Sequence, residues 1–234
     1  MAGSNAYQPQ KAAVVIGATG LVGTLLVNQL INSSHYHTIY QFVRRAGSKS
    51  SNGKLRTIVV PDFSQLDAYL IGLDLNHADA FSALGTTLKQ AGSRQAFRQV
   101  DFDYNLIFAQ LVKKLGVQHF LLLSATGANP VSPIFYNRVK GELERAVEQL
   151  GFEHLSIFQP SLLIGQHQDQ RVLENLAQAA FAYTRSWFPA TWKYRPVEAG
   201  RVAKAMVLAT HVPAPGKIVY SNTDILTLTL ENPT

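Results

Sequence analysis

Short runs of apolar residues alternate along this chain with longer stretches in which apolar residues recur every three or four positions. The short runs, rich in β-branched and aromatic residues, predict strands over Ala12–Ile16, Ile39–Val43, Leu55–Val60, Ala78–Ala83, Phe120–Leu123 and Leu155–Phe158. The longer stretches predict amphipathic helices over Leu21–Asn32, Phe63–Leu70, Arg94–Leu115, Ile134–Leu150, Arg171–Tyr183 and Val197–Thr210.

Strands that alternate with helices, and that are apolar throughout, are typical of a parallel sheet covered on both faces. Right-handed crossovers then give an α/β fold with a doubly wound parallel sheet. We expect one domain over residues 1–234. Because the alternation is weaker after Pro160, we expect residues 160–234 to add a small lobe on the substrate side.

Composition narrows the class of protein. The 234 residues are 47% hydrophobic and 15% charged, as in an ordinary globular domain, and the absence of cysteine excludes disulfides and thiol nucleophiles. The histidines lack ligand spacing, so we expect no metal site. No leader-like segment and no apolar run of about 20 residues is visible, so we expect a cytoplasmic protein without a membrane partner.

A glycine-rich turn joins the first predicted strand to the first predicted helix. It contains Gly17, Gly20 and Gly23 in the spacing GxxGxxG. Glycines at such a turn let pyrophosphate approach the main chain, and the helix N-terminus then faces the phosphates with unpaired N–H groups. The turn therefore indicates dinucleotide binding, with a ligand-free strand–helix connection as the alternative.

The formal charge of +6 lies entirely in the part of the chain that holds this turn. Residues 1–61 carry six basic and no acidic side chains, whereas residues 62–234 carry fifteen of each. Since no DNA- or RNA-binding module accompanies this charge, we expect a phosphate-rich small ligand rather than nucleic acid. Arg44 and Arg45 end the second strand, where arginine accommodates a 2′-phosphate. We therefore expect NADP(H) in preference to NAD(H), unless these arginines are simply solvated.

A second constellation carries candidate chemistry. Tyr136 and Lys140 are four residues apart on a predicted helix and so share one face. A neighbouring ammonium group stabilises a phenolate and makes tyrosine a better general acid and base. Ser124 follows the fifth strand at the sheet edge where ligands bind, and could orient a carbonyl group. An ordinary exposed helix pair is the alternative for Tyr136 and Lys140.

These features, in this order, resemble the short-chain dehydrogenase/reductase superfamily, in its atypical or extended members with an NAD(P)-binding Rossmann fold. More closely, the chain is similar to the Tat-interactive-protein-like oxidoreductase branch. The segments that carry this resemblance are Val14–Gly23, Phe42–Arg45, Leu84–Thr87, Val100–Tyr104, His119–Gly127, Tyr136–Gly141 and Phe158–Ser161.

The resemblance implies a role for each matching residue. It implies a reactive triad of Ser124, Tyr136 and Lys140, the last two also touching the cofactor. The further cofactor-binding residues that it implies are Gly17, Thr19, Gly20, Leu21 and Val22 at the pyrophosphate, Arg44 and Arg45 at the 2′-phosphate, Asp62 and Phe63 at the adenine, Leu84, Gly85 and Thr86 after the fourth strand, and Pro160, Ser161, Leu162 and Leu163 beside the nicotinamide.

The chain departs from the family pattern at three places. Leu84–Thr87 replaces an Asn-Asn-Ala-Gly-like segment, Ala125 follows Ser124 where a second serine is common, and Asp101 stands where many relatives have asparagine. Asn105 is a candidate substitute for that asparagine. These departures leave cofactor binding intact and make the proton relay the open point.

Two functions follow. We expect an NADP(H)-dependent oxidoreductase that transfers hydride to or from a small carbonyl or alcohol, with tyrosine as general acid and base. The alternative is a regulatory protein that senses NADP(H) without turnover. Aromatic residues favour an apolar or aromatic carbonyl substrate, if they line a pocket rather than form core: Phe135, Trp187, Phe188, Trp192 and Tyr194.

Overall fold

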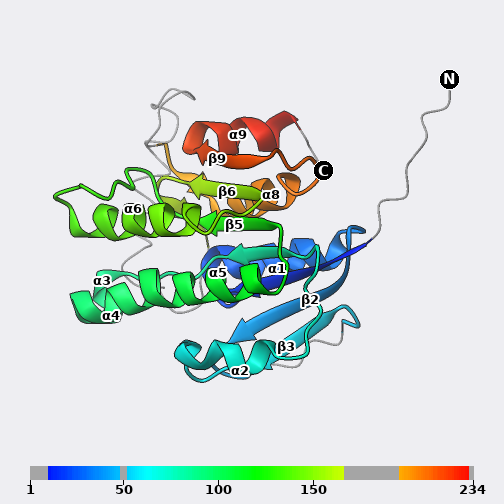
Figure 1. Ribbon diagram of the computed structural model, residues 1–234. Coiled ribbons are helices and arrows are strands. Elements are labelled where there is room, and N and C mark those ends of the chain that lie inside the picture. The colour runs from blue at the N-terminus through cyan, green and yellow to red at the C-terminus, as the bar shows by residue number, and fades with distance from the viewer. Residues whose placement is uncertain (1–9, 48–51, 166–194, 232–234) are drawn as a thin grey trace.

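The computed structural model describes residues 10–47, 52–165 and 195–231, which form three layers around a central sheet (Figure 1). The described strands of this sheet are all parallel and lie in the order β3-β2-β1-β4-β5-β6-β9. Their bounds are β1 Lys11–Ile16, β2 Tyr36–Val43, β3 Leu55–Val59, β4 Asp79–Ser82, β5 His119–Leu123, β6 His154–Gln159 and β9 Gly216–Ser221. The doubly wound α/β fold is therefore confirmed.

Helices cover both faces of the sheet. On one face lie α1 (Leu21–Asn32), α8 (Ala199–Leu208) and α9 (Asn222–Glu231), and on the other α2 (Leu66–Leu70), α5 (Tyr104–Lys114) and α6 (Phe135–Glu148). The remaining elements are short: η1 Phe63–Gln65, α3 Leu88–Ala91, α4 Arg94–Arg98, the π-helical turn η2 Gln99–Asp103, and a separate parallel pair of β7 Leu163–Ile164 and β8 Val197–Glu198.

The two cores explain why the strands are apolar throughout. Successive side chains of a strand point to opposite faces. On β1, Val14 and Ile16 face the core under α5 and α6, whereas Ala13 and Val15 face the core under α1 and α8. All four side chains are fully buried. A polar side chain in the middle of such a strand is buried and needs a hydrogen-bond partner, as Ser156 on β6 has in His119.

The structure confirms the six predicted strands and the predicted bounds of α1. Three helices differ from prediction. The helix predicted from Phe63 begins as the short turn η1 and becomes α-helical only at Leu66. The stretch predicted as one helix from Arg94 to Leu115 is interrupted by η2, and the helix predicted from Val197 begins only after β8. The predicted helix Arg171–Tyr183 lies outside the described residues.

The C-terminal residues were expected to form a lobe. Of these, residues 195–231 place β9 at the edge of the main sheet and pack α8 against α1. Neither β9 nor α9 was predicted, because Lys217 and a half-exposed edge position give β9 a weak apolar pattern. The rest of the expected lobe, apart from residues 160–165, lies outside the described residues.

Polar side chains at the amino-terminal ends of the central strands make contacts that stabilise the fold. Asp79, buried at the start of β4, accepts a hydrogen bond from the Tyr36 hydroxyl at 2.7 Å and pairs with Lys11 at 3.4 Å. Burial, followed by the charge of Asp79, raises the pKa of Tyr36 well above its usual value, so this phenol stays a donor.

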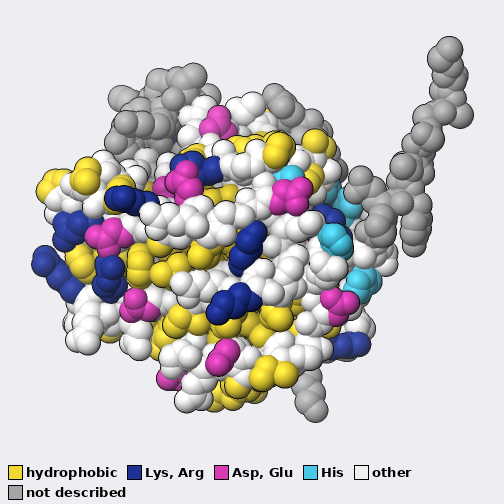
Figure 2. Space-filling model, in the orientation of Figure 1, with side chains coloured by type: hydrophobic (Ala, Val, Ile, Leu, Met, Phe, Trp, Pro, Cys, Tyr) yellow, Lys and Arg dark blue, Asp and Glu magenta, His cyan; other side chains and the backbone are white. Residues whose placement is uncertain are grey.

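Figure 2 shows histidines gathered near this end of the molecule. Within the described ranges, no group of three or more acidic or histidine side chains could hold a metal ion.

The glycine turn packs tightly against its own surroundings. Gly17 has φ +75°, and a Cβ there would lie 2.3 Å from the carbonyl carbon of Ala83. A Cβ on Gly23 would lie 2.0 Å from the carbonyl oxygen of Gly17. Both glycines are therefore required by the fold itself, because α1 could not otherwise approach β1 and β4 so closely.

We predict that Gly23→Ala destabilises the protein, because the added methyl group overlaps the backbone of Gly17. Forcing an extra carbon into a packed region costs about 1–3 kcal/mol. For a chain of this size, each kcal/mol corresponds to a fall in Tm of about 2–4 °C. Thermal unfolding followed by circular dichroism measures the change.

Gly20→Ala is the matched control, because the nearest atom to its added Cβ, among those outside the local backbone, is the Gly17 oxygen at 3.3 Å. It should unfold close to the parent temperature. Equal Tm values for Gly23→Ala and the parent would contradict the packing argument.

Candidate functional site

Two adjoining pockets open at the carboxyl-terminal ends of the central strands. The first, the arginine pocket, has a volume of about 540 Å³, and the second, the tyrosine pocket, of about 370 Å³. Gly20, Ala83, Leu84 and Gly85 line both of them, so the two form one continuous cleft. The arginine pocket is further lined by Gly17, Thr19, Phe42, Val43, Arg44, Arg45, Ala46, Gly47 and Phe63, and the tyrosine pocket by Leu21, Val22, Thr86, Thr87, Gln90, Asp101, Leu123, Ser124, Tyr136, Lys140 and Leu163.

The middle of the cleft is formed by the start of α1. Gly20 is the N-cap of this 12-residue helix, and no side chain caps it. Apart from the Gly17 oxygen at 3.3 Å, no atom outside the local backbone lies within 4 Å of a Cβ built on Gly20. The main chain of Gly20 is thus open to the cleft, and the N–H groups and dipole of α1 favour an anion there.

The arginine pocket brings together most, but not all, of the residues expected at the adenosine end. Arg44 and Arg45 are exposed where β2 ends, and the buried Phe63 forms part of the wall. Asp62 does not line the pocket. Its carboxylate caps η1 by accepting the Ser64 N–H at 2.9 Å, and it accepts the Tyr104 hydroxyl at 3.1 Å.

In the tyrosine pocket, the structure brings the predicted triad together. Ser124 follows β5 and is fixed by its N–H, which donates to the Phe158 carbonyl at 2.8 Å. Tyr136 and Lys140 lie one turn apart on α6. The connection between β5 and α6 packs directly on this helix, since a Cβ on Gly141 would lie 2.3 Å from the Asn129 carbonyl carbon. This close contact sets the distance between Ser124 and the helix.

Lys140 is held by an acidic partner. Its ammonium group lies 2.7 Å from Oδ1 of Asp101, and both side chains are almost fully buried, with 6% and 1% exposed. The other carboxylate oxygen accepts the Thr86 N–H at 2.8 Å. Burial alone would lower the pKa of Lys140, but the Asp101 carboxylate, together with Tyr136 and Glu144, outweighs burial and holds that pKa above its usual value. Lys140 is therefore charged at neutral pH.

Asp101, rather than Asn105, faces the tyrosine pocket. A Cβ on Gly85 would lie 3.2 Å from Asp101 Oδ1, so this glycine keeps the ion pair close to the cleft. Asn105 points elsewhere: its amide donates to the carbonyls of Val100 at 2.8 Å and Leu84 at 3.3 Å, and its oxygen accepts the Ser82 hydroxyl. Asn105 thus fixes the loop after β4 and does not replace the expected asparagine in the pocket.

The sequence interpretation missed two polar residues behind Ser124. The Ser124 hydroxyl donates to Glu144 Oε1, and the Gln159 amide lies 3.0 Å from each Glu144 oxygen. Burial raises the pKa of Glu144 despite these hydrogen bonds. The available signal was spacing, because Tyr136, Lys140 and Glu144 recur every four residues on α6.

The segment after β6 mainly supports the fold. Leu163 lines the tyrosine pocket, but Pro160, Ser161 and Leu162 line neither pocket. The Pro160 carbonyl accepts the Thr126 N–H, the Ser161 hydroxyl donates to the Arg195 carbonyl, and the Leu162 carbonyl accepts the Val197 N–H. These contacts fix the start of β7 and hold β8 beside it.

The expected aromatic lining is not found where the structure can test it. Phe135 packs against Phe97 with ring centroids 5.7 Å apart, and it does not line the tyrosine pocket. Trp187, Phe188, Trp192 and Tyr194 lie outside the described residues. The apolar wall of the tyrosine pocket is instead aliphatic, formed mainly by leucines.

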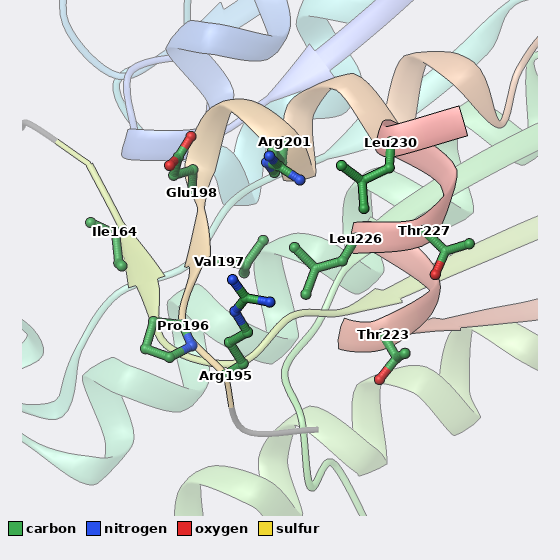
Figure 3. A pocket seen from close by; sticks show the side chains of 10 residues that line it. All are labelled: Ile164, Arg195, Pro196, Val197, Glu198, Arg201, Thr223, Leu226, Thr227 and Leu230. Atoms are coloured by element: carbon green, nitrogen blue, oxygen red, sulfur yellow. The ribbon is translucent and has the colours of Figure 1, made fainter. Parts of the chain in front are cut away.

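A further cavity of about 180 Å³ lies between β8, α8 and α9 (Figure 3). It combines the basic side chains of Arg195 and Arg201 with an apolar wall that includes Leu226 and Leu230. No residue lines both this cavity and the tyrosine pocket. It is therefore separate from the cleft.

Proteins named FMP52 and HTATIP2 are similar to this chain in sequence. FMP52 of Candida albicans, named mitochondrial, is 32% identical over 197 residues, which cover 82% of this chain and 85% of that protein. HTATIP2 of Rattus norvegicus is 36% identical over 174 residues, which cover 73% and 70%. The fmp52 protein of Emericella nidulans is 36% identical over 167 residues, covering 70% and 72%. No protein-family model matches the chain.

Solved structures of similar fold are more distant in sequence. A UDP-glucose 4-epimerase of Thermotoga maritima superposes with a TM-score of 0.66 at 15% identity, covering 89% of this chain and 75% of the epimerase. The oxidoreductase ylbE of Lactococcus lactis gives 0.60 at 18% identity, covering 94% and 97%. These likenesses support the Rossmann fold.

The names of the relatives also correct one expectation. Several FMP52 proteins are named mitochondrial, so the expected cytoplasmic location is wrong. In the part of the chain that the structure describes, no helix combines the length and apolar character needed to cross a membrane. The sequence similarity, over most of both chains, shows that this chain belongs to the FMP52 and HTATIP2 family.

Proposed function

We propose that this chain is an NADP(H)-dependent oxidoreductase that interconverts a small carbonyl compound and its alcohol. One observation carries the proposal: Ser124, Tyr136 and Lys140 line a single pocket that continues into a second pocket lined by Arg44 and Arg45. The cleft thus offers polar groups for a reacting oxygen at one end and fixed positive charge at the other.

The cleft fits an extended dinucleotide. The uncapped start of α1 lies between the two pockets, where a pyrophosphate would meet N–H groups. The two arginines offer bidentate hydrogen bonds for a 2′-phosphate, which supports NADP(H) over NAD(H). A bound nicotinamide cofactor would supply or accept the hydride. A solved structure of MoeE5, which shares the fold, contains NAD. The fold alone therefore does not select NADP(H), and the proposed preference rests on this chain's own arginines.

The residues of the tyrosine pocket would handle the proton. Tyr136 donates a proton to the substrate oxygen in reduction and accepts it in oxidation. Lys140, held charged by Asp101, interacts electrostatically with Tyr136 and offers N–H donors to a ribose hydroxyl. Ser124 fixes the substrate oxygen. The leucines around these groups favour an apolar substrate.

We predict that replacing both Arg44 and Arg45 with alanine weakens NADPH binding about ten- to a hundredfold. A hydrogen bond to a charged group contributes about 1.5–3 kcal/mol, and each 1.4 kcal/mol corresponds to about a tenfold change in Kd. NADH binding should change little, because NADH lacks the 2′-phosphate. Isothermal titration calorimetry with both cofactors measures this, and equal affinity of the parent protein for NADPH and NADH would contradict the assignment.

We predict that Gly20→Val abolishes cofactor binding while the protein stays folded. The side chain would project into the shared part of the cleft, where it excludes the pyrophosphate. The readout is the rise in Tm that NADPH causes, which should be present in the parent and absent in the variant. A variant that NADPH still stabilises would show that the glycine turn is structural only.

We predict that Tyr136→Phe lowers turnover and leaves cofactor affinity nearly unchanged. The substitution removes one hydroxyl and keeps the ring that packs against Phe97. General acid catalysis contributes about 10²–10⁴-fold, so kcat should fall by that factor. The assay is the loss of NADPH absorbance with a panel of aldehydes, ketones and quinones.

Lys140→Ala is the comparison variant, and it should reduce both turnover and NADPH affinity. Unchanged kcat in Tyr136→Phe would remove Tyr136 from the mechanism. Tight NADPH binding by the parent, with no turnover of any compound in the panel, would favour the alternative of a regulatory protein that senses NADP(H).

A further inference from the structure

Glu144 lies directly behind Ser124, outside the predicted triad. It is on the same face of α6 as Tyr136 and Lys140, one turn beyond the lysine. The Ser124 hydroxyl donates to its Oε1 atom, and the Gln159 amide lies 3.0 Å from both carboxylate oxygens. Glu144 does not line the tyrosine pocket, so it would act on a substrate only through Ser124.

We infer that Glu144 is a positioning residue that decides whether Ser124 offers a hydrogen or a lone pair to the substrate oxygen. This inference rests on the proposed oxidoreductase function. A serine hydroxyl has one hydrogen, and an ionised carboxylate can only accept. While Glu144 is ionised, it takes that hydrogen, and Ser124 presents lone pairs to the pocket. When Glu144 is protonated, it donates to Ser124, whose own hydrogen is then free for a carbonyl oxygen.

The two states suit opposite directions of the reaction. A carbonyl substrate has only acceptor atoms at its oxygen, so its reduction requires Ser124 as a donor. An alcohol substrate has a hydroxyl hydrogen, which a lone pair of Ser124 can accept while Tyr136 takes the proton. Protonated Glu144 therefore favours reduction, and ionised Glu144 favours oxidation. Glu144 itself neither gains nor loses a proton over the catalytic cycle.

The surroundings of Glu144 allow both states. Burial disfavours the charge, whereas the hydrogen bonds from Ser124 and Gln159 and the positive charges of Lys140 on α6 and Lys217 on β9 favour it. Burial outweighs them and leaves the pKa of Glu144 above its usual value. Lys217 has an ion pair of its own with Glu148 at 2.6 Å, and Lys140 has its ion pair with Asp101. Neither lysine is therefore a dedicated partner that would keep Glu144 ionised.

The kinetic test follows the pH dependence of both directions, with NADPH and phenanthrenequinone for reduction and NADP⁺ with a cyclic secondary alcohol for oxidation. In the parent, kcat for reduction should fall about 2- to 10-fold as Glu144 ionises, the effect of one hydrogen bond. Oxidation should rise over the same pH range. Glu144→Gln stays neutral and can donate an N–H to Ser124. In this variant, the change of kcat with pH that Glu144 causes should disappear from both profiles.

Glu148→Gln is the matched control, since it removes a carboxylate one turn further along α6 that pairs with Lys217. Its pH profiles should keep the shape of the parent's. If Glu144→Gln lowers kcat equally at every pH and the shape is unchanged, Glu144 has only a structural role and the inference is overturned.

A second arm needs no turnover. Carbon-13 NMR of protein labelled at the glutamate carboxyl carbons follows the titration of Glu144, which is assigned by its absence in Glu144→Gln. Because the hydrogen bond from Ser124 stabilises the carboxylate, Ser124→Ala should move the midpoint to higher pH. A midpoint that does not respond to Ser124→Ala would overturn the coupling. A response without turnover of any substrate would refute the oxidoreductase function and the catalytic role, but retain the coupling of Ser124 to Glu144.

Discussion

The buried ion pair between Asp101 and Lys140 is the interaction on which the candidate site depends. The pair joins three elements that are separate in sequence. Asp101 lies on η2, its carboxylate accepts the N–H of Thr86 in the loop after β4, and Lys140 lies on α6. Removing one partner of a buried pair leaves an uncompensated charge and typically costs about 3–5 kcal/mol. Asp101 therefore fixes the loop that lines the cleft relative to the helix that carries Tyr136, because its carboxylate binds both.

This contact also gives the pocket its electrostatic character. Lys140 contributes a positive charge, Asp101 balances it, and Ser124 and Glu144 form a second polar pair behind it. Leucines line the pocket beside the Asp101–Lys140 pair, and both side chains of that pair are almost fully buried, so each charge acts strongly on its neighbours. A reacting oxygen in this pocket would meet a few fixed polar groups in an otherwise apolar wall, which is the usual composition of a site for a small ligand.

Much of the fold, and part of the site, could be predicted from the sequence. The strands β1, β4, β5 and β6 were recognisable because both of their faces are covered, and α1 because a glycine turn precedes it. The edge strand β9 was not, because half-exposed edges tolerate polar residues. Ser124, Tyr136 and Lys140 lie in one pocket as expected.

The partners of the site residues were not predictable in the same way. The roles of Asp101 and Asn105 depend on the π-helical turn, which no apolar periodicity reveals. Asp62 was expected at the adenine, but its carboxylate accepts the Ser64 N–H at 2.9 Å and caps η1, a contact that only the backbone of the turn reveals. Glu144 was missed because its relation to Ser124 depends on how the loop packs at Gly141.

The π-helical turn also limits how this chain can change in length. A π turn accommodates one residue more than an α turn, and in an α-helix each residue advances the chain by about 100°. Five residues of a π turn rotate the chain by nearly the same angle as four residues of an α-helix, so the extra residue leaves the orientation of α4 relative to α5 almost unchanged. Deleting one residue between Gln99 and Asp103 would therefore leave Arg98 with its partner Glu142 on α6, but would displace the residues inside the turn, among them Asp101, whose carboxylate meets Lys140. In this helix the number of residues, as well as their identity, is constrained by the site.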